Sequence, residues 1–333
     1  MKILYLPVHS ILEHDEVKLL TEIGHTVFSM DSYRNPGSPI DPIRPAIPGV
    51  FNERLSSIAM QCSKDNLHKD LIEWADIIIV MHRHDWIINN WPNIRHKKVI
   101  WRTIGQSVPW IEKELNQARS EGLKIVRYSP MEDTIPGYRG HDEIIRFYKD
   151  PEEFTNWNGS KAEVLTVAQS MKARERYCGY DLFLAATQNL PRALYGRGNE
   201  DSEYSKGYLE YEDLKQVYRD YRVYFYTGTY PASYTLNFIE AMMTGIPIVA
   251  IGPKLADLKI IPGMNAYEVH KIIKHGENGF CSDDFNELRG NLEYMLAHPD
   301  EARKIGEAGR KTAIELFGKE SIKKQWQEFL NNL

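Results

Sequence analysis

The sequence lacks the features that mark several classes of protein. Its 333 residues include only three cysteines, Cys62, Cys178 and Cys281, which are odd in number and far apart. This argues against a disulfide framework and against a cysteine-based metal cluster, and it favours a reducing compartment, the cytoplasm. No apolar run approaches the length of a membrane-spanning helix. The net charge of −5 provides no general attraction to nucleic acid.

Motifs for common cofactors are also missing. The turn after the first apolar run reads PVHSIL and contains no G-x-G-x-x-G, which argues against a nicotinamide dehydrogenase. No D-x-D pair or other convincing metal constellation lies in the second half of the chain. We therefore expect neither a metal nor a bound cofactor.

Apolar runs alternate with segments of helical periodicity along the whole chain. Alternation of this kind predicts α/β architecture with parallel, doubly wound sheets. Because the chain is too long for one ordinary core, we predict two domains, residues 1–155 and 156–312, joined near 150–161. The predicted strands are residues 2–8, 26–30, 77–81, 98–101, 124–127, 164–168, 192–195, 223–226 and 246–251. The predicted helices include residues 14–24 and 108–121.

The most informative stretch of the sequence runs from Tyr224 to Phe280. An apolar strand leads into a turn with Gly228 and Pro231, and then into a helical segment that carries Glu240. A second apolar strand follows at 246–251. The turn and the helix N-terminus offer unpaired N–H groups and a partial positive charge, an arrangement that suits a phosphate.

This stretch resembles the nucleotide-sugar site of the family-4 glycosyltransferases, retaining enzymes of the GT-B fold. The resemblance implies two Rossmann-like domains that face a central cleft, the acceptor in the first and a nucleotide-diphosphate sugar in the second. It also implies that a helix over 313–333 crosses back to the first domain. The matching residues are Glu240, Ala241, Met242, Gly245, Pro247, Val249, Glu268, Gly276, Asn278 and Gly279.

The resemblance also implies a donor-binding set. In the family, Glu240 would bind the ribose diol, for which an ionised carboxylate is a strong acceptor. A carboxylate one turn into a helix is also consistent with a surface position that complements the helix dipole. Backbone groups of the turn would meet the diphosphate, although the same residues suit an ordinary N-cap. The remaining donor-binding predictions are Ser233, Tyr234, Thr235, Leu236, Gly196, Gly198 and Arg174.

The chain departs from the family at positions that normally carry charge. The first glutamate of the family's pair would lie eight residues before Glu240, where this chain has Ala232. The expected Gly-Arg falls on Gln169 and Ser170, and the expected Lys-Gly on Cys178 and Gly179. A leaving diphosphate needs positive charge, so we predict that Lys172, Arg174 or Arg176 substitutes. A solvated basic loop is the alternative.

Polar residues at predicted strand ends in the first half suggest a second set of contacts. His82, His84 and Asp85 follow the strand 77–81, and the resemblance places the second histidine at the reaction centre. A zinc pair or a structural histidine remains an alternative, although no third zinc ligand is evident. The predicted acceptor-binding residues are His9, His82, Arg102, Thr103, Gln106 and Arg127, and the predicted catalytic residues are His84, Asp85, Lys172 and Arg176.

We therefore predict a retaining, metal-independent glycosyltransferase, a hexosyl- or pentosyltransferase with a nucleotide-diphosphate sugar as donor. The acceptor is open: a glycan, a lipid-linked sugar, a small molecule or a modified nucleobase of DNA, the last not favoured by the net charge. Two alternatives are a sugar-nucleotide epimerase, with Glu132 as its one loose acid–base candidate, and a non-catalytic sugar-nucleotide-binding protein, which the loss at Ala232 supports.

Overall fold

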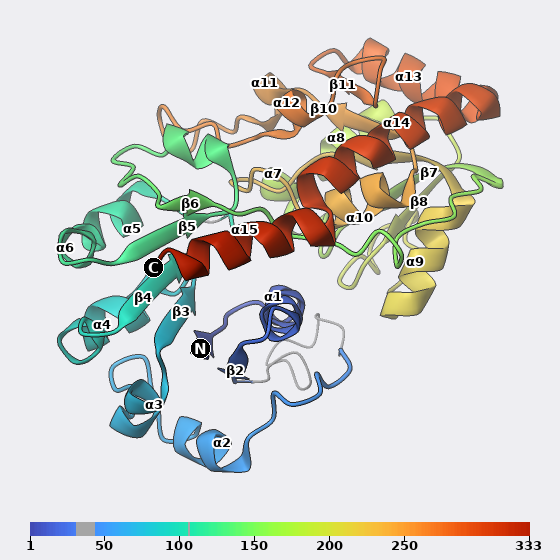
Figure 1. Cartoon of the computed structure of the whole chain (residues 1–333). Coiled ribbons are helices and arrows are strands. Elements are labelled where there is room, and N and C mark those ends of the chain that lie inside the picture. Colours follow the sequence, from blue (N-terminus) through green and yellow to red (C-terminus); the bar gives the residue numbers. More distant parts are fainter. Residues whose placement is uncertain (31–43, 106) are drawn as a thin grey trace. The chain divides into compact units, whose positions relative to one another are not determined.

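The chain forms two compact units in the computed structural model, which describes residues 1–30, 44–105 and 107–333 (Figure 1). Unit 1 comprises Met1–Phe147 and Ile322–Leu333, and unit 2 comprises Tyr148–Ser321. The sequence led us to expect divisions near residues 155 and 312. None of the helices in the described residues is long and apolar enough to cross a membrane.

Unit 1 is built on a six-stranded parallel sheet with the order β2-β1-β3-β4-β5-β6. The order reverses between β1 and β3, so the loops after these two strands leave the sheet at a topological switch point. Its elements are β1 (Lys2–Leu6), α1 (Ser10–Glu22), β2 (Thr26–Ser29), α2 (Glu53–Ala59), α3 (Lys69–Trp74), β3 (Ile77–Met81), α4 (His84–Ile94), β4 (Lys98–Arg102), α5 (Pro109–Glu114), α6 (Asn116–Ser120), β5 (Lys124–Arg127), the 3-10 helix η1 (Pro130–Thr134) and β6 (Glu143–Ile144).

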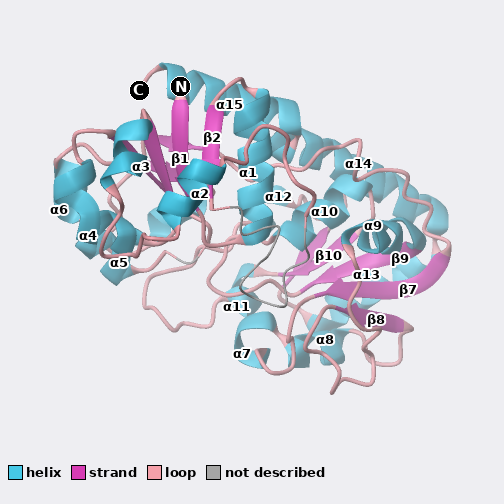
Figure 2. Cartoon of the chain, turned by 90° about the horizontal axis from the view of Figure 1, so that it is seen from below, coloured by secondary structure: helices cyan, strands magenta, loops and turns pink. Residues whose placement is uncertain are grey.

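Unit 2 repeats this design with a five-stranded parallel sheet in the order β11-β10-β9-β7-β8, of which Figure 2 shows β7 to β10 as neighbouring strands. Its switch point lies between β7 and β9. Helix α13 packs on β7, β9 and β10, and α10 packs on α9 and α14. The elements are β7 (Lys161–Val167), α7 (Glu175–Cys178), α8 (Tyr180–Ala186), β8 (Arg192–Tyr195), α9 (Tyr211–Asp220), β9 (Tyr221–Tyr226), α10 (Leu236–Thr244), β10 (Ile248–Ile251), α11 (Pro253–Ala256), α12 (Val269–Ile272), β11 (Phe280–Ser282), α13 (Phe285–Ala297) and α14 (Pro299–Phe317). The last helix, α15 (Lys319–Asn331), belongs to unit 1 from Ile322 onward.

The predicted parallel sheets are confirmed. The central strands β3 and β10 are buried at every residue, which explains their continuous apolar sequences. Two local predictions were wrong. The helix predicted from His14 begins at Ser10, because the His9 side chain accepts a hydrogen bond from the N–H of Leu12 and caps the helix. The helix predicted over 108–121 is divided at Leu115 into α5 and α6.

A buried ion pair anchors the core of unit 1. Arg102, at the end of β4, contacts Glu16 of α1 at 2.6 Å, and both side chains are almost fully buried. The guanidinium also donates to the carbonyl of Ile145 at 2.6 Å and lies 5.6 Å from the ring centroid of Trp326 on α15. Arg102 therefore holds α1, the end of the sheet and the C-terminal helix together.

Arg102→Met should destabilise the protein by about 3–5 kcal/mol, because it leaves Glu16 buried without its counter-ion. Urea unfolding followed by circular dichroism measures the loss. The matched control is Lys324→Met, which breaks an exposed ion pair between Lys324 and Glu328 on α15. This change should lower the free energy of unfolding by about 0.5 kcal/mol or less. Equal losses in the two variants would contradict an anchoring role for Arg102.

Candidate functional site

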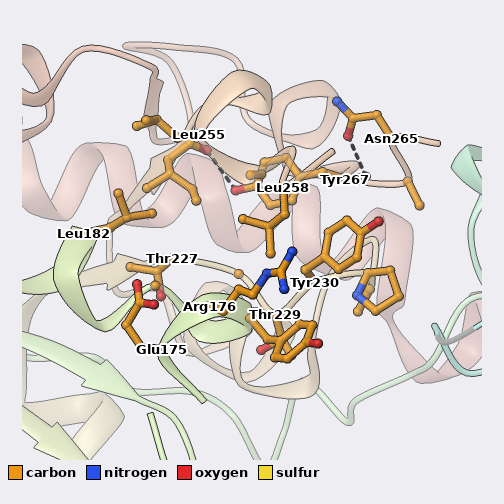
Figure 3. Close-up of a pocket in the computed structure, with 18 residues that line it drawn as sticks. Glu175, Arg176, Leu182, Thr227, Thr229, Tyr230, Leu255, Leu258, Asn265 and Tyr267 are labelled. Atoms are coloured by element: carbon orange, nitrogen blue, oxygen red, sulfur yellow. Dashed lines mark hydrogen bonds between the residues drawn. The ribbon is translucent and has the colours of Figure 1, made fainter. Parts of the chain in front are cut away.

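A pocket of about 180 Å³ lies in unit 2 at the carboxyl ends of β9 and β10 (Figure 3). Its walls come from α7, from the loop 227–232 after β9, and from the segments 251–258 and 265–267. Ligands bind at this edge of open α/β sheets, next to the switch point. The polar side chains on its wall are Glu175, Arg176, Tyr177, Thr227, Thr229, Tyr230, Asn265 and Tyr267.

Hydrogen bonds hold the pocket walls in place. Tyr267 donates its hydroxyl to the carbonyl of Ile251 at 2.8 Å, which ties the far wall to the end of β10. Thr227 donates to the carbonyl of Cys178 at 2.6 Å, and the N–H of Tyr230 donates to the carbonyl of Tyr177 at 2.8 Å. The loop after β9 is therefore fixed to α7 by two bonds, so the pocket is preformed.

The three predicted cations of the loop after β7 lie in different surroundings. Arg176 lines the pocket, and its guanidinium lies beside the ring of Tyr230 in Figure 3. Within the described part of the chain, Arg176 has no ion pair. Lys172 instead pairs with Asp201 at 3.3 Å, and neither Lys172 nor Arg174 is part of the pocket wall. Arg176 is thus the best placed of the three to meet a ligand.

Cys178 occupies the position where the resemblance led us to expect a lysine. Its side chain is buried, burial raises the pKa of the thiol, and its sulfur lies 4.0 Å from the Thr229 hydroxyl. The position contributes no positive charge. Ala232, which stands where the resemblance expects a carboxylate, also lines the pocket.

The turn before α10 is more buried than the sequence suggested. Ser233 and Tyr234 are buried, and the carbonyl of Ser233 accepts from the N–H of Glu268 at 3.0 Å. Thr235 is the N-cap residue, but its hydroxyl donates to the Tyr226 hydroxyl at 3.1 Å instead of capping the helix. Leu236 opens the helix. Thr235 and Leu236 are therefore the members of this predicted set that reach the surface.

Glu240 lies one turn further along α10 and has two partners. One carboxylate oxygen is 2.8 Å from the ammonium of Lys149, and the other accepts the hydroxyl of Tyr218 at 3.3 Å. Glu240 is 6% exposed, so the alternative of a solvated surface carboxylate is wrong. Sequence reasoning missed Lys149, because nothing in the local pattern links residue 149 to residue 240.

The predicted glycine turn at 196–198 packs against the loop after β7. A Cβ atom on Gly196 would lie 2.1 Å from the carbonyl oxygen of Ala168, so only glycine fits. The buried Asn199 joins the two loops by donating to the carbonyls of Ala168 and Gly196 at 2.7 and 2.8 Å. Neither Gly196 nor Gly198 lines the pocket. Asn199 was missed; its only signal was a polar residue directly after G-R-G.

His82 and His84, the two histidines predicted to act in unit 1, both lie directly after β3. His84, the first residue of α4, lies 2.7 Å from the carboxylate of Glu114 on α5. The guanidinium of Arg83 donates two hydrogen bonds, of 2.9 and 2.6 Å, to the carboxylate of Asp85. These bonds lower the pKa of the Asp85 carboxyl. Outside residues 31–43 and 106, no group of three or more potential ligands could hold a metal ion.

His82 has an unusual backbone conformation. Its φ of 58° lies in the left-handed region, which is uncommon for any residue other than glycine. Burial, and then the nearby His84, lower the pKa of the imidazole to about 4. Nδ1 is buried and has no hydrogen-bond partner among the described residues. Strained residues with unmatched polar atoms concentrate at functional sites.

Three of the predicted acceptor contacts are buried in the core of unit 1. Arg102 is held by Glu16, and Arg127 is held by Glu112 at 2.6 Å. Thr103 is fully buried and donates to Glu132 at 2.6 Å. None of these three side chains reaches the surface, so the prediction that they contact an acceptor is not supported. His9 caps α1, and Gln106 lies outside the described residues.

The pKa values of Arg127 and Glu132 are shifted for different reasons. Although burial lowers the pKa of Arg127, hydrogen bonds with Glu112 and the charges of Glu132 and Glu112 outweigh it and leave the pKa raised. Burial raises the pKa of Glu132. Glu132 is 2% exposed, so it is enclosed in the core and not displayed to a substrate.

We compared the sequence and the fold with those of known proteins. A family model described as glycosyl transferase-like matches residues 174–326, which include the pocket and α10. None of the curated proteins matches the sequence. Anabaena HepE, solved in complex with UDP-glucose, has a TM-score of 0.69 at 14% identity, with 100% of both chains covered. Sucrose-phosphate synthase from Thermosynechococcus elongatus has a TM-score of 0.67 at 16% identity, with 100% of this chain and 98% of that chain covered.

The chain has the GT-B fold. A glycosyltransferase from Rickettsia africae shares the fold over 100% of this chain and 99% of its own, with a TM-score of 0.66 and 15% identity. The two parallel sheets of this chain are the two halves of that fold, and the predicted fold class is confirmed.

The stability of this GT-B protein should depend on pH through His82. Between pH 6.5 and pH 4 the unfolded state binds a proton at this residue and the folded state does not, so folding loses up to about 3 kcal/mol as the pH falls. His82→Asn should remove this loss, because asparagine tolerates the left-handed backbone and does not titrate. Urea unfolding at pH 7 and pH 4.5 measures it.

The control for this experiment is His96→Asn, which changes a half-exposed histidine and should leave the pH dependence as it is in the unaltered protein. If His82→Asn loses as much stability on acidification as the unaltered protein, the account of His82 as a buried neutral imidazole is wrong.

Proposed function

We propose that the chain is a retaining glycosyltransferase that takes its sugar from a nucleotide-diphosphate donor bound in unit 2. The observation that carries the proposal is the pocket at the carboxyl ends of β9 and β10, with Arg176 on its wall and the motif-bearing helix α10 directly after its loop. The family match over residues 174–326 supports the same part of the chain.

The lining of the pocket favours a sugar. Its volume is about 180 Å³, and hydroxyl, amide and carboxylate side chains stand on its wall. Such groups form hydrogen bonds with the hydroxyls of a sugar. We assign the diphosphate to Arg176 and to the partly buried turn at Thr235 and Leu236, and the ribose to Glu240. HepE was crystallised with UDP and glucose, which supports a donor of this class.

Charge development accounts for the role of Arg176. As the bond between the sugar and the diphosphate breaks, the leaving oxygen gains negative charge, and a guanidinium fixed nearby stabilises that charge. The acceptor hydroxyl attacks the same face of the sugar, and the departing phosphate takes its proton. This route retains the configuration at the sugar and needs neither a protein nucleophile nor a metal ion.

We assign the acceptor to unit 1, where His82 and His84 lie at the carboxyl end of β3 and Asp85 follows. The Nε2 atom of His84 lies 2.7 Å from a carboxylate oxygen of Glu114, and this contact fixes the orientation of the histidine ring. A ring held in this way is suited to orient an acceptor hydroxyl by hydrogen bonding.

Ala232 bears on the donor sugar. A carboxylate at this position would accept hydrogen bonds from hexose hydroxyls, and alanine leaves that part of the pocket neutral and wider. We therefore propose a donor other than the plain hexose, such as a pentose or a modified hexose. Faster turnover of UDP-glucose than of every pentose and deoxy-sugar donor would overturn this assignment.

Turnover of a panel of nucleotide sugars by the purified protein tests the proposed function. We expect release of nucleoside diphosphate from at least one donor, at a rate unaffected by excess EDTA. Arg176→Met should lower kcat by about 10- to 100-fold, because one charged donor to the leaving group is lost. Lys172→Met and Arg174→Met should change kcat by less than threefold.

Two outcomes would count against this proposal. Loss of turnover in EDTA, restored by magnesium or manganese, would refute the metal-independent mechanism. Binding of a nucleotide sugar without any turnover or hydrolysis would favour a non-catalytic binding protein, which the absence of charge at Ser170, Cys178 and Ala232 also suits. The epimerase alternative loses its candidate residue, because Glu132 is enclosed by Arg127, Thr103 and the N–H of Tyr128.

A further inference from the structure

The contact between Lys149 and Glu240 is among the most enclosed ion pairs of unit 2. The ammonium and the carboxylate are 2.8 Å apart, and the side chains are 2% and 7% exposed. The hydroxyl of Tyr218, which is fully buried, reaches the second carboxylate oxygen at 3.3 Å. Burial and the charge of Glu240 raise the pKa of Tyr218, so it remains a neutral donor.

An ionised carboxylate in such surroundings needs compensation. Transfer of a lone carboxylate from water into a protein interior is unfavourable, and the group would take up a proton or turn towards solvent. Lys149 supplies the compensating charge at close range. Only this lysine pairs with Glu240 among the described residues, because Tyr218 contributes no charge.

Lys149 is itself held from several directions. Its N–H donates to the carbonyl of Phe317 at 3.0 Å, and its ammonium lies 5.6 Å from the centroid of the Phe154 ring. The next residue, Asp150, contacts Lys319 at 3.4 Å. The ammonium therefore has a fixed position, and it fixes the direction in which the Glu240 carboxylate points.

We propose that Lys149 is the positioning residue of the nucleotide site, holding the Glu240 carboxylate in place and aimed at the ribose diol. The inference rests on the proposed function, which assigns the ribose to Glu240. A carboxylate has about four lone-pair sites, and Lys149 and Tyr218 use two, so two remain for the ribose hydroxyls. Lys149, at 2% exposure, does not touch the ligand and acts only through Glu240.

This role differs from a purely structural one in a measurable way. If Lys149 only stabilised the fold, its loss would weaken the binding of all nucleotides equally. If it positions the ribose acceptor, its loss removes the discrimination between a ribose and a 2′-deoxyribose. The ratio of two dissociation constants therefore reports the role, and the ratio is independent of the fraction of protein that is folded.

The experiment is calorimetric titration with UDP and with 2′-deoxy-UDP. The unaltered protein should bind UDP about 10- to 100-fold more tightly than 2′-deoxy-UDP, the range expected for one hydrogen bond to a charged group. Lys149→Met should bring the ratio below about threefold. Glu240→Gln should do the same, and the double variant should have the same ratio as either single one.

Two further variants keep the test decisive. Lys149→Arg keeps a positive charge beside Glu240 and changes only where the donors lie, so this protein should fold even where Lys149→Met does not, and its ratio should fall below that of the unaltered protein because the carboxylate is displaced. Lys215→Met removes another buried lysine of unit 2, which pairs with Glu212 at 2.7 Å on α9, and should keep the ratio of the unaltered protein.

The outcomes separate the inference from the proposed function. A protein that binds none of UDP, ADP, GDP or CDP, or that does not distinguish UDP from 2′-deoxy-UDP, overturns the proposed ribose site and the inference with it. A protein that distinguishes them, and whose Lys149→Met variant keeps the full ratio, overturns only the role of Lys149. A double variant that keeps the full ratio overturns the ribose site at Glu240 and the inference with it.

Discussion

The candidate site depends on two loops that leave the sheet of unit 2 at its switch point, one after β7 and one after β9. Parallel strands bring the ends of these loops to one edge, but backbone pairing does not decide their shape. Side chains do: Asn199 holds the first loop against the glycine turn, and Thr227 holds the second loop against α7. With both loops fixed, Arg176 and Ala232 line the same pocket.

Much of the fold follows from the sequence because parallel strands buried on both faces must be continuously apolar. The strands at 77–81, 124–127 and 192–195 have the predicted bounds. Helix α10 was also recognisable from its own sequence. Gly245 ends the helix in a left-handed conformation, and Glu240 is the only charged residue of the helix. These features are local, so a short window of sequence contains them.

The site was less predictable because its decisive contacts link distant residues. Arg102 and Arg127 looked like polar groups displayed at strand ends, but Glu16 and Glu112 draw both into the core. The partner of Arg102 lies 86 positions away in sequence. The choice among the cations of the loop after β7, and the pairing of Lys149 with Glu240, depend on tertiary structure in the same way. Residue type alone could not separate a buried counter-ion from a ligand contact.

Hydrogen exchange followed by mass spectrometry, with and without saturating UDP-glucose or the best donor of the panel, tests the central claim most directly. The account predicts slower exchange in residues 174–179, in the loop 227–235 and at the start of α10, because a donor would cover these segments. It predicts no change around the buried networks of Arg102 and Arg127. Protection confined to unit 1, with residues 174–179 and 227–235 unchanged at saturation, would contradict a donor site in unit 2.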